Sequence, residues 1–128
     1  MAYNVLIVDD SAVTRAVVAK TLRMANLQLG EVLEAGDGRQ ALDLMDSHWV
    51  DIVFADVNMP VMNGVEMVDE MAKRGTMGST PVVIISTERS ATRIEELMSK
   101  GVRAYLQKPF TAESIKEITD KLLGGGNE

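Results

Sequence analysis

The sequence contains no cysteine, so disulfide bridges, thiolate metal sites and cysteine nucleophiles are all excluded. No apolar run approaches the roughly 18 residues that a membrane span needs, and the first residues, Met1-Ala2-Tyr3-Asn4, lack the basic segment of a signal peptide. Basic residues are the minority, 13 against 19 acidic ones, which gives a net charge of −6. That sign argues against a nucleic-acid surface, because such surfaces neutralise phosphates with cations. We therefore expect an acidic cytoplasmic protein.

The composition is that of one globular domain. Hydrophobic residues make up 46% of the 128 residues and charged residues 25%, which supplies enough apolar surface for one core. No linker-like stretch or internal repeat divides the chain. Glycines at 124, 125 and 126 end the last helical segment, so we expect one domain over residues 1–124 and a flexible tail over residues 125–128.

Short apolar runs alternate with stretches of helical period. Strands are predicted at residues 5–8, 31–35, 51–56, 82–85 and 104–106, and each is followed by a helical pattern. The first helix, over residues 12–25, carries Val13, Ala16, Val17 and Met24 on one side, and Met67, Met71 and Met98 lie at core spacing in later helices. Ser90 and Thr111 are predicted to cap the last two helices. Five such units predict an α/β fold, a doubly wound five-stranded parallel sheet with helices on both faces.

Acidic, hydroxyl and basic residues follow the predicted strands. Asp9 and Asp10 come after the first strand, Asp56 closes the third, Ser86 follows the fourth and Lys108 follows the fifth. Because the carboxyl ends of parallel strands share one edge of the sheet, we expect these side chains to meet there.

Three carboxylates in one pocket repel one another unless a cation lies among them. Carboxylate oxygens with an incomplete shell suit Mg²⁺, which also accepts phosphate oxygens. Lys108 and Ser86 supply an ammonium and a hydroxyl for a phosphoryl group, and a carboxylate such as Asp56 can act as the nucleophile. The set therefore predicts phosphoryl transfer to Asp56, by positioning and charge stabilisation.

Four motifs carry a resemblance that spans essentially the whole chain. They are Asp9-Asp10, Asp56-Val57-Asn58-Met59-Pro60 with Gly64, Ser86-Thr87 and Lys108-Pro109-Phe110. In this combination the chain resembles a bacterial two-component response-regulator receiver domain, most closely the stand-alone chemotaxis type. The resemblance implies a flavodoxin-like (βα)5 sheet with strand order 2-1-3-4-5, which the spacing alone does not give.

The resemblance also implies roles for single residues. Asp56 would be the phosphorylation site, with Mg²⁺ bound by the carboxylates of Asp10 and Asp56, by the carbonyl of Asn58 and by Asp9 through water. Lys108 would pair with the phosphoryl group and precede a cis peptide bond to Pro109. Asn58 and Glu88 would tune the rate at which the phosphoryl group is lost.

Signalling would follow from a switch in which Ser86 and Tyr105 turn toward the phosphorylated site. The expected partners are a sensor histidine kinase, whose phosphohistidine supplies the group, and a downstream protein on the face of the fourth helix, fifth strand and fifth helix, such as a flagellar motor switch component. The resemblance implies a cytoplasmic, monomeric phosphoprotein that is not an enzyme but promotes its own phosphotransfer and dephosphorylation.

Two other functions compete with this interpretation. Gly36-Asp37-Gly38-Arg39-Gln40-Ala41 fits the dinucleotide-binding pattern G-x-G-x-x-A, with Asp56 about 20 residues further on. It follows the second strand instead of the first and leaves Ser86 and Lys108 unexplained. The other alternative is an interaction module of the same fold that never takes up phosphate. Such relatives lack one of the acids or the lysine of the site, whereas in this chain all of these residues are present.

Overall fold

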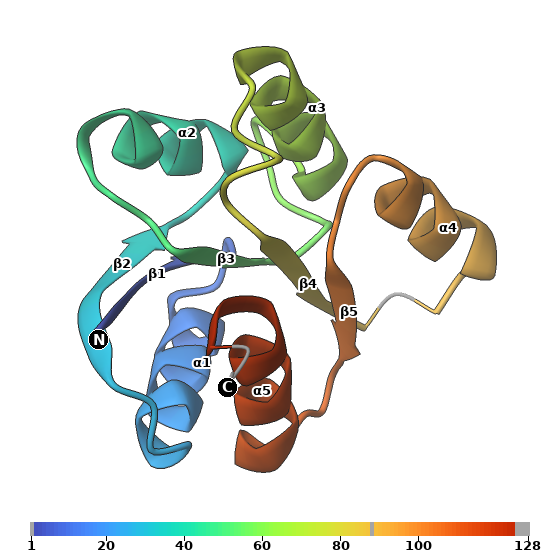
Figure 1. The fold of residues 1–128 in the computed structure, drawn as a ribbon. Helices are drawn as coiled ribbons and strands as arrows, with labels where there is room; N and C mark the ends of the chain where they lie inside the picture. The colour runs from blue at the N-terminus through green and yellow to red at the C-terminus, as the bar shows by residue number, and fades with distance from the viewer. Residues whose placement is uncertain (1, 88, 125–128) are drawn as a thin grey trace.

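The computed structural model describes residues 2–87 and 89–124, and within them it contains one five-stranded parallel sheet between two layers of helices (Figure 1). The strand order is β2-β1-β3-β4-β5, as the resemblance implies. The strands are β1 Tyr3–Val8, β2 Leu29–Ala35, β3 Ile52–Ala55, β4 Val82–Ser86 and β5 Ala104–Gln107. The predicted fold class is therefore confirmed. β2 starts two residues earlier than predicted, because Leu29 pairs with Tyr3 of β1.

Each helix begins directly after a polar residue whose side chain accepts a backbone N–H of the first turn. The helices are α1 Ala12–Met24, α2 Gly38–Ser47, α3 Gly64–Arg74, α4 Ala91–Ser99 and α5 Ala112–Thr119, followed by a π-helical turn over Asp120–Gly124. The capping residues are Ser11, Asp37, Asn63, Ser90 and Thr111. The caps predicted at Ser90 and Thr111 are confirmed. No helix in the described part of the chain is long and apolar enough to cross a membrane.

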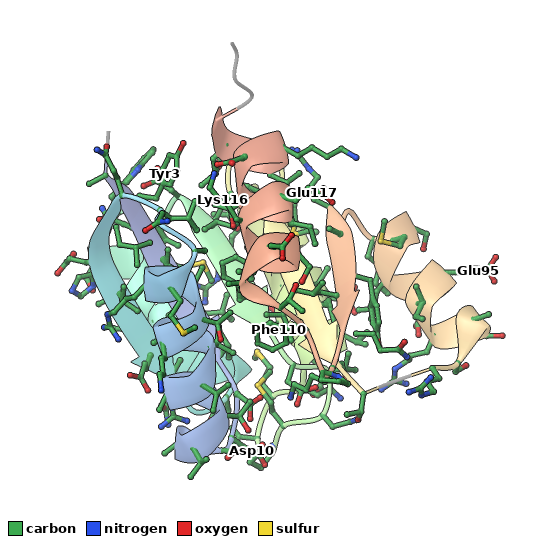
Figure 2. All side chains as sticks on the ribbon, turned by 90° about the horizontal axis from the view of Figure 1, so that it is seen from below. Tyr3, Asp10, Glu95, Phe110, Lys116 and Glu117 are labelled. Carbon is green, nitrogen blue, oxygen red and sulfur yellow. The ribbon has the colours of Figure 1, made fainter. Side chains whose placement is uncertain are left out.

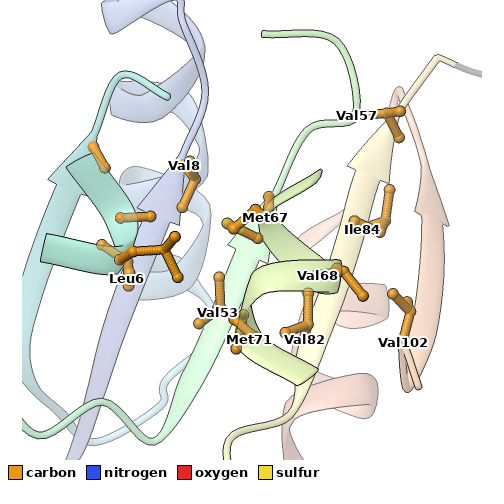
Figure 3. Close-up of a cluster of buried hydrophobic side chains, with 14 of the residues drawn as sticks. Leu6, Val8, Val53, Val57, Met67, Val68, Met71, Val82, Ile84 and Val102 are labelled. Atoms are coloured by element: carbon orange, nitrogen blue, oxygen red, sulfur yellow. The ribbon is translucent and has the colours of Figure 1, made fainter. Parts of the chain in front are cut away.

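Two buried clusters hold the helices on the sheet. On one face, Val5 and Ile7 of β1 pack with α1 and α5. On the other face, Leu6 and Val8 of the same strand pack with α2, α3 and α4 (Figure 3). Successive side chains of a strand point to opposite faces, so a continuous apolar run such as β1 supplies both clusters. The rigid sheet between them is what brings the strand ends, and the residues after them, to one edge.

The packing of α1 differs from the prediction. Val13 and Met24 are 75% and 63% exposed, and the helix is buried instead through Val18, Ala19 and Leu22. Both sets recur at helical spacing, so periodicity alone does not say which stripe meets the sheet. The core position predicted for Met98 on α4 is wrong for the same reason: its side chain is exposed, and the buried residue is Leu97.

Candidate functional site

Three of the five residues expected to converge, Asp9, Asp56 and Lys108, meet at the carboxyl edge of the sheet. Asp9 follows β1, Asp56 follows β3 and Lys108 follows β5. The ammonium Nζ of Lys108 lies 3.3 Å from Oδ2 of Asp9 and 3.4 Å from Oδ2 of Asp56. The cation therefore bridges two carboxylates that come from distant parts of the chain.

Each of these two carboxylates is held by a backbone amide. The N–H of Ser11 donates to Oδ1 of Asp9 at 2.9 Å, and the N–H of Val57 donates to Oδ1 of Asp56 at 2.6 Å. In both acids the remaining oxygen, Oδ2, turns toward Lys108. In each carboxylate, Oδ1 fixes the orientation of the group, and Oδ2 is left to bind a cation or to react.

Burial has the largest effect on the pKa of Asp9, because only 5% of this residue is exposed. Loss of solvation raises the pKa of Asp9 above its usual value of 3.8, and the nearby charge of Asp56 raises it further, while the Ser11 amide and the Lys108 ammonium lower it. Since the folded state binds this proton more tightly than the unfolded chain, ionisation of Asp9 opposes folding. The stability that Asp9 contributes is present below pH 3.8 and is lost as the pH rises through the raised value. A cation at this edge is therefore stabilising near neutral pH.

Asp10, the third carboxylate expected at this edge, follows Asp9 directly in the loop after β1, and among the described residues Lys108 pairs with Asp9 and Asp56 but not with Asp10. The Asp10 side chain is exposed, and Figure 2 shows it at the N-terminal end of α1, at the end of the molecule opposite Tyr3. Among the described residues no group of three acids or histidines is arranged to hold a metal ion.

The residues nevertheless fit Mg²⁺. The ion is bound in proteins by one or two carboxylates and keeps several waters, so it does not need three acids. Here an ammonium already stands between two carboxylate oxygens, where a cation is favoured, and the exposed Asp10 and Asn58 lie next in sequence to Asp9 and Val57. Asp10, Asp56 and the Asn58 carbonyl, with Asp9 through water, are the oxygens that could hold the ion.

The remaining predicted residues are distributed around this edge. Ser86 ends β4, is buried, and its carbonyl accepts the N–H of Lys108 at 2.9 Å. Tyr105 is half-buried against the cluster of Figure 3. The peptide bond between Lys108 and Pro109 is cis, as the resemblance implies. Glu88 lies outside the described residues. The roles assigned to Ser86 and Tyr105 remain predictions.

The loop that follows Asp56 is tightly folded. A Cβ atom at Gly64 would lie 2.6 Å from the Asp56 carbonyl oxygen, closer than real Cβ contacts allow. Val61 has φ +64°, and the N–H of Met62 donates to the Pro60 carbonyl at 2.6 Å across it. A three-residue turn of this sign is rare and strained, above all for a β-branched residue. The loop thus combines a close backbone approach with a strained tip.

Sequence reasoning did not find Arg15, which touches the site from α1. Its guanidinium donates through Nη1 to the backbone carbonyl of Asp9, and its Nε lies 2.9 Å from Oε1 of Glu34 on β2. A basic residue close to the N-terminal end of a helix is opposed by the helix dipole. That unfavourable position is the signal in the sequence that could have drawn attention to Arg15.

The glycine-rich turn is not available as a phosphate cradle. The N–H of Gly36 donates to the Gln40 side chain, that of Gly38 donates to the Met62 carbonyl, and the Asp37 carboxylate accepts the N–H of Gln40. A phosphate-binding helix N-terminus needs such donors to point at the ligand, and here an acid caps the helix. Gly38 instead allows the close approach of α2 to the β3–α3 loop. The structure thus gives no support to the nucleotide-binding alternative.

An apolar groove of about 270 Å³ opens beside Lys108. It runs between α1 and the loop that leads from β5 to α5, and its walls include the exposed Val13 and Val17 together with Phe110. The stripe of α1 that does not meet the sheet is therefore one wall of a groove that adjoins Lys108.

The chain is similar to known proteins over nearly its whole length. The family model described as the response regulator receiver domain matches residues 5–120. A chemotaxis protein CheY homolog of Campylobacter jejuni is 34% identical over 125 residues, which cover 97% of this chain and 95% of the relative. CheY-3 of Vibrio cholerae is 36% identical over 119 residues, 93% of this chain and 90% of the relative. The crystal structure of Vibrio cholerae CheY4 has a TM-score of 0.84 and 35% identity, covering 96% of this chain and 100% of that one.

Proposed function

The chain belongs to the response regulator receiver domain family, and we propose that it accepts a phosphoryl group on Asp56 from a phosphohistidine of a sensor kinase. The observation that carries this proposal is the bridge of Lys108 between the carboxylates of Asp9 and Asp56. We propose residues 1–124 as the receiver domain, with 125–128 as a tail. Its activity is that of a phospho-accepting signalling protein, which promotes its own phosphorylation and dephosphorylation without turning over another substrate.

The geometry suits attack by Oδ2 of Asp56. Because Oδ1 accepts the Val57 amide, Oδ2 is the oxygen that forms the new bond to phosphorus, while the bond from phosphorus to the imidazole nitrogen breaks and its electron pair returns to the ring. No base is needed, since an ionised carboxylate has no proton to lose. Lys108, 3.4 Å from Oδ2, is placed to pair with a phosphoryl oxygen.

Receiver domains typically use Mg²⁺. Asp10, Asp56, the carbonyl of Asn58 and Asp9 through water would hold it, and a bound ion stabilises negative charge on the phosphoryl oxygens. Asp9 and Lys108 then keep complementary roles. The buried acid attracts cations to this edge, and the ammonium is free to follow the incoming phosphoryl group instead of bridging the two carboxylates.

The groove beside Lys108 supports delivery of the group by another protein. Its apolar walls, which include Val13 and Phe110, adjoin Lys108, so a helix carrying the phosphohistidine could bury apolar side chains there and present its imidazole to Asp56. The relatives named above are chemotaxis proteins, and we extend that pathway to this chain.

We propose that phosphorylation is sensed by Ser86 and Tyr105 and transmitted to the face formed by α4, β5 and α5. Ser86 ends β4, and Tyr105 pairs with Ile84 two residues before it, so both lie on neighbouring strands leading to the site. The added charge would shift this face between two states, and a downstream protein, such as a flagellar motor switch component, would bind one of them. Asn58 and Glu88 are proposed to tune the lifetime of the phosphoryl group.

The proposal is tested by incubating the protein with acetyl phosphate and Mg²⁺ and measuring its intact mass. We expect the wild type to gain the mass of one phosphoryl group and Asp56→Asn to gain none. Asp46→Asn, a change of the same kind at an exposed acid on α2, should behave as the wild type. A wild type that gains no mass would refute phosphotransfer and leave the interaction module of the same fold as the function.

A further inference from the structure

Arg15 links three elements beside the site. It lies on α1 with a side chain that is 18% exposed, and Nη1 donates to the carbonyl oxygen of Asp9 in the loop after β1. Its Nε pairs at 2.9 Å with Glu34 on the edge strand β2. One guanidinium therefore joins a helix, an edge strand and the backbone of the loop that carries both Asp9 and Asp10.

The contact constrains Asp10 as well as Asp9. A peptide unit is planar, so the plane that holds the carbonyl of Asp9 also holds the nitrogen and Cα of Asp10. The N–H of Asp9 is bonded to the Ala35 carbonyl, and its side chain is held by the Ser11 amide. Asp10 has an exposed side chain, so the direction in which it leaves the backbone depends on the peptide that Arg15 holds.

We propose that Arg15, anchored by Glu34, is a positioning residue that orients the Asp9–Asp10 peptide for cation binding. The inference rests on the proposed function, because it assigns the arrangement of the same site. Arg15 acts through geometry, since its bond goes to a backbone carbonyl and not to a carboxylate of the site. Glu34 acts through Arg15, because it fixes the guanidinium from the opposite side.

The planar fork of arginine is what the two contacts require. Nε and Nη1 belong to one rigid group and point to two acceptors on different elements, whereas lysine offers a single charged nitrogen. Arg15→Lys therefore keeps the charge and removes the link. If Arg15 acted only by its charge, this conservative variant would restore binding.

The test compares Arg15→Lys, Glu34→Gln and the double variant with the wild type in the full chain. Mg²⁺ binding is measured directly by isothermal titration calorimetry, and urea unfolding reports on the fold. Groups that orient metal ligands typically contribute ten- to a hundredfold to affinity, so we expect Arg15→Lys to raise the Mg²⁺ dissociation constant about tenfold. Glu34→Gln should have a smaller effect, and the double variant should lose no more than Arg15→Lys alone.

Arg74 and Asp46 provide a matched control pair. Nη1 of Arg74 lies 3.1 Å from Asp46 and links α3 to α2, so Arg74→Lys changes a similar pair without touching the Asp9–Asp10 loop. The inference is overturned if Arg15→Lys binds Mg²⁺ as the wild type does, if Arg74→Lys weakens binding as much, or if the wild type binds no Mg²⁺. Should Arg15→Lys fail to fold, Glu34→Gln, at an exposed position, carries the test.

Failure of this inference and failure of the proposed function give different results. A wild type that takes up the phosphoryl group while Arg15→Lys keeps its Mg²⁺ affinity refutes only the role of Arg15. A wild type that binds Mg²⁺ but gains no mass from acetyl phosphate refutes the proposed function, and the titration with Arg15→Lys still measures how the loop is positioned.

Discussion

Replacing Lys108 by methionine tests the electrostatic account of the site most directly. Methionine keeps much of the length of the side chain and removes its charge. In the metal-free protein the substitution leaves the carboxylates of Asp9 and Asp56 facing each other with no cation between them. We therefore expect a loss of stability, and a gain in affinity for Mg²⁺, because the ammonium no longer competes for the same two oxygens.

The size of the loss follows from the distances. The two Oδ2 atoms lie 3.3 Å and 3.4 Å from one nitrogen, so they cannot be further apart than the sum, about 6.7 Å. At an effective dielectric constant near 20, two unit charges at that separation repel by about 2.5 kcal/mol. Removing one partner of a largely buried ion pair costs about 3–5 kcal/mol. Water entering the site offsets part of this, so we expect the free energy of unfolding to fall by about 3 kcal/mol at pH 7.

The loss should depend on pH with a defined sign. The pKa of Asp9 is already raised by burial, and removing Lys108 takes away a charge that lowers it. As the pH falls through this raised pKa, Asp9 takes up a proton in the folded state and the repulsion from Asp56 disappears. The difference in stability between the variant and the wild type is therefore expected to be largest near neutral pH and to shrink as the pH falls through the raised pKa of Asp9.

Urea unfolding followed by circular dichroism, in EDTA and in Mg²⁺, measures these quantities. Lys100→Met is the matched control, because Lys100, the C-cap residue of α4, pairs with one half-exposed acid, Asp69 of α3, at 2.8 Å and bridges no second carboxylate among the described residues. The free energy of unfolding should fall less in Lys100→Met than in Lys108→Met, and the loss in Lys100→Met should be the same in EDTA and in Mg²⁺. The reasoning is refuted if Lys108→Met is as stable as the wild type in EDTA at pH 7, or if Mg²⁺ stabilises both proteins equally.

Two further predictions concern the loop after Asp56. Val61→Asn should raise the free energy of unfolding by about 1 kcal/mol, because asparagine tolerates the positive φ that valine adopts at a cost. Val13→Asn makes the same exchange at an exposed helical residue and should not stabilise the protein in the same urea titration. Gly64→Ala should lower stability by about 2 kcal/mol and slow phosphorylation by acetyl phosphate, because the new methyl group meets the Asp56 carbonyl. Gly78→Ala, where nothing lies within 4 Å, should leave both measurements unchanged, and an equal loss at the two glycines would contradict this explanation.

Much of the site could be predicted because it depends on strand direction. Asp9, Asp56 and Lys108 each come directly after a strand, and parallel strands end at one edge whatever the details of their packing. The contacts within the site could not be predicted in this way. That one ammonium bridges two carboxylates and that Arg15 holds the Asp9 carbonyl are properties of the assembled site.

The local pattern of the chain by itself determined its α/β class, its five strands and the caps at Ser90 and Thr111, because apolar runs, helical periods and capping residues act between near neighbours in sequence. Only the tertiary structure decided which stripe of α1 faces the sheet, that Arg15 reaches both Asp9 and Glu34, and that one lysine bridges two acids. These features depend on residues far apart in the chain, such as Asp9 and Lys108, which are 99 positions apart. The energies of these contacts arise from burial and charge in the folded protein, so they cannot be predicted from a local sequence pattern.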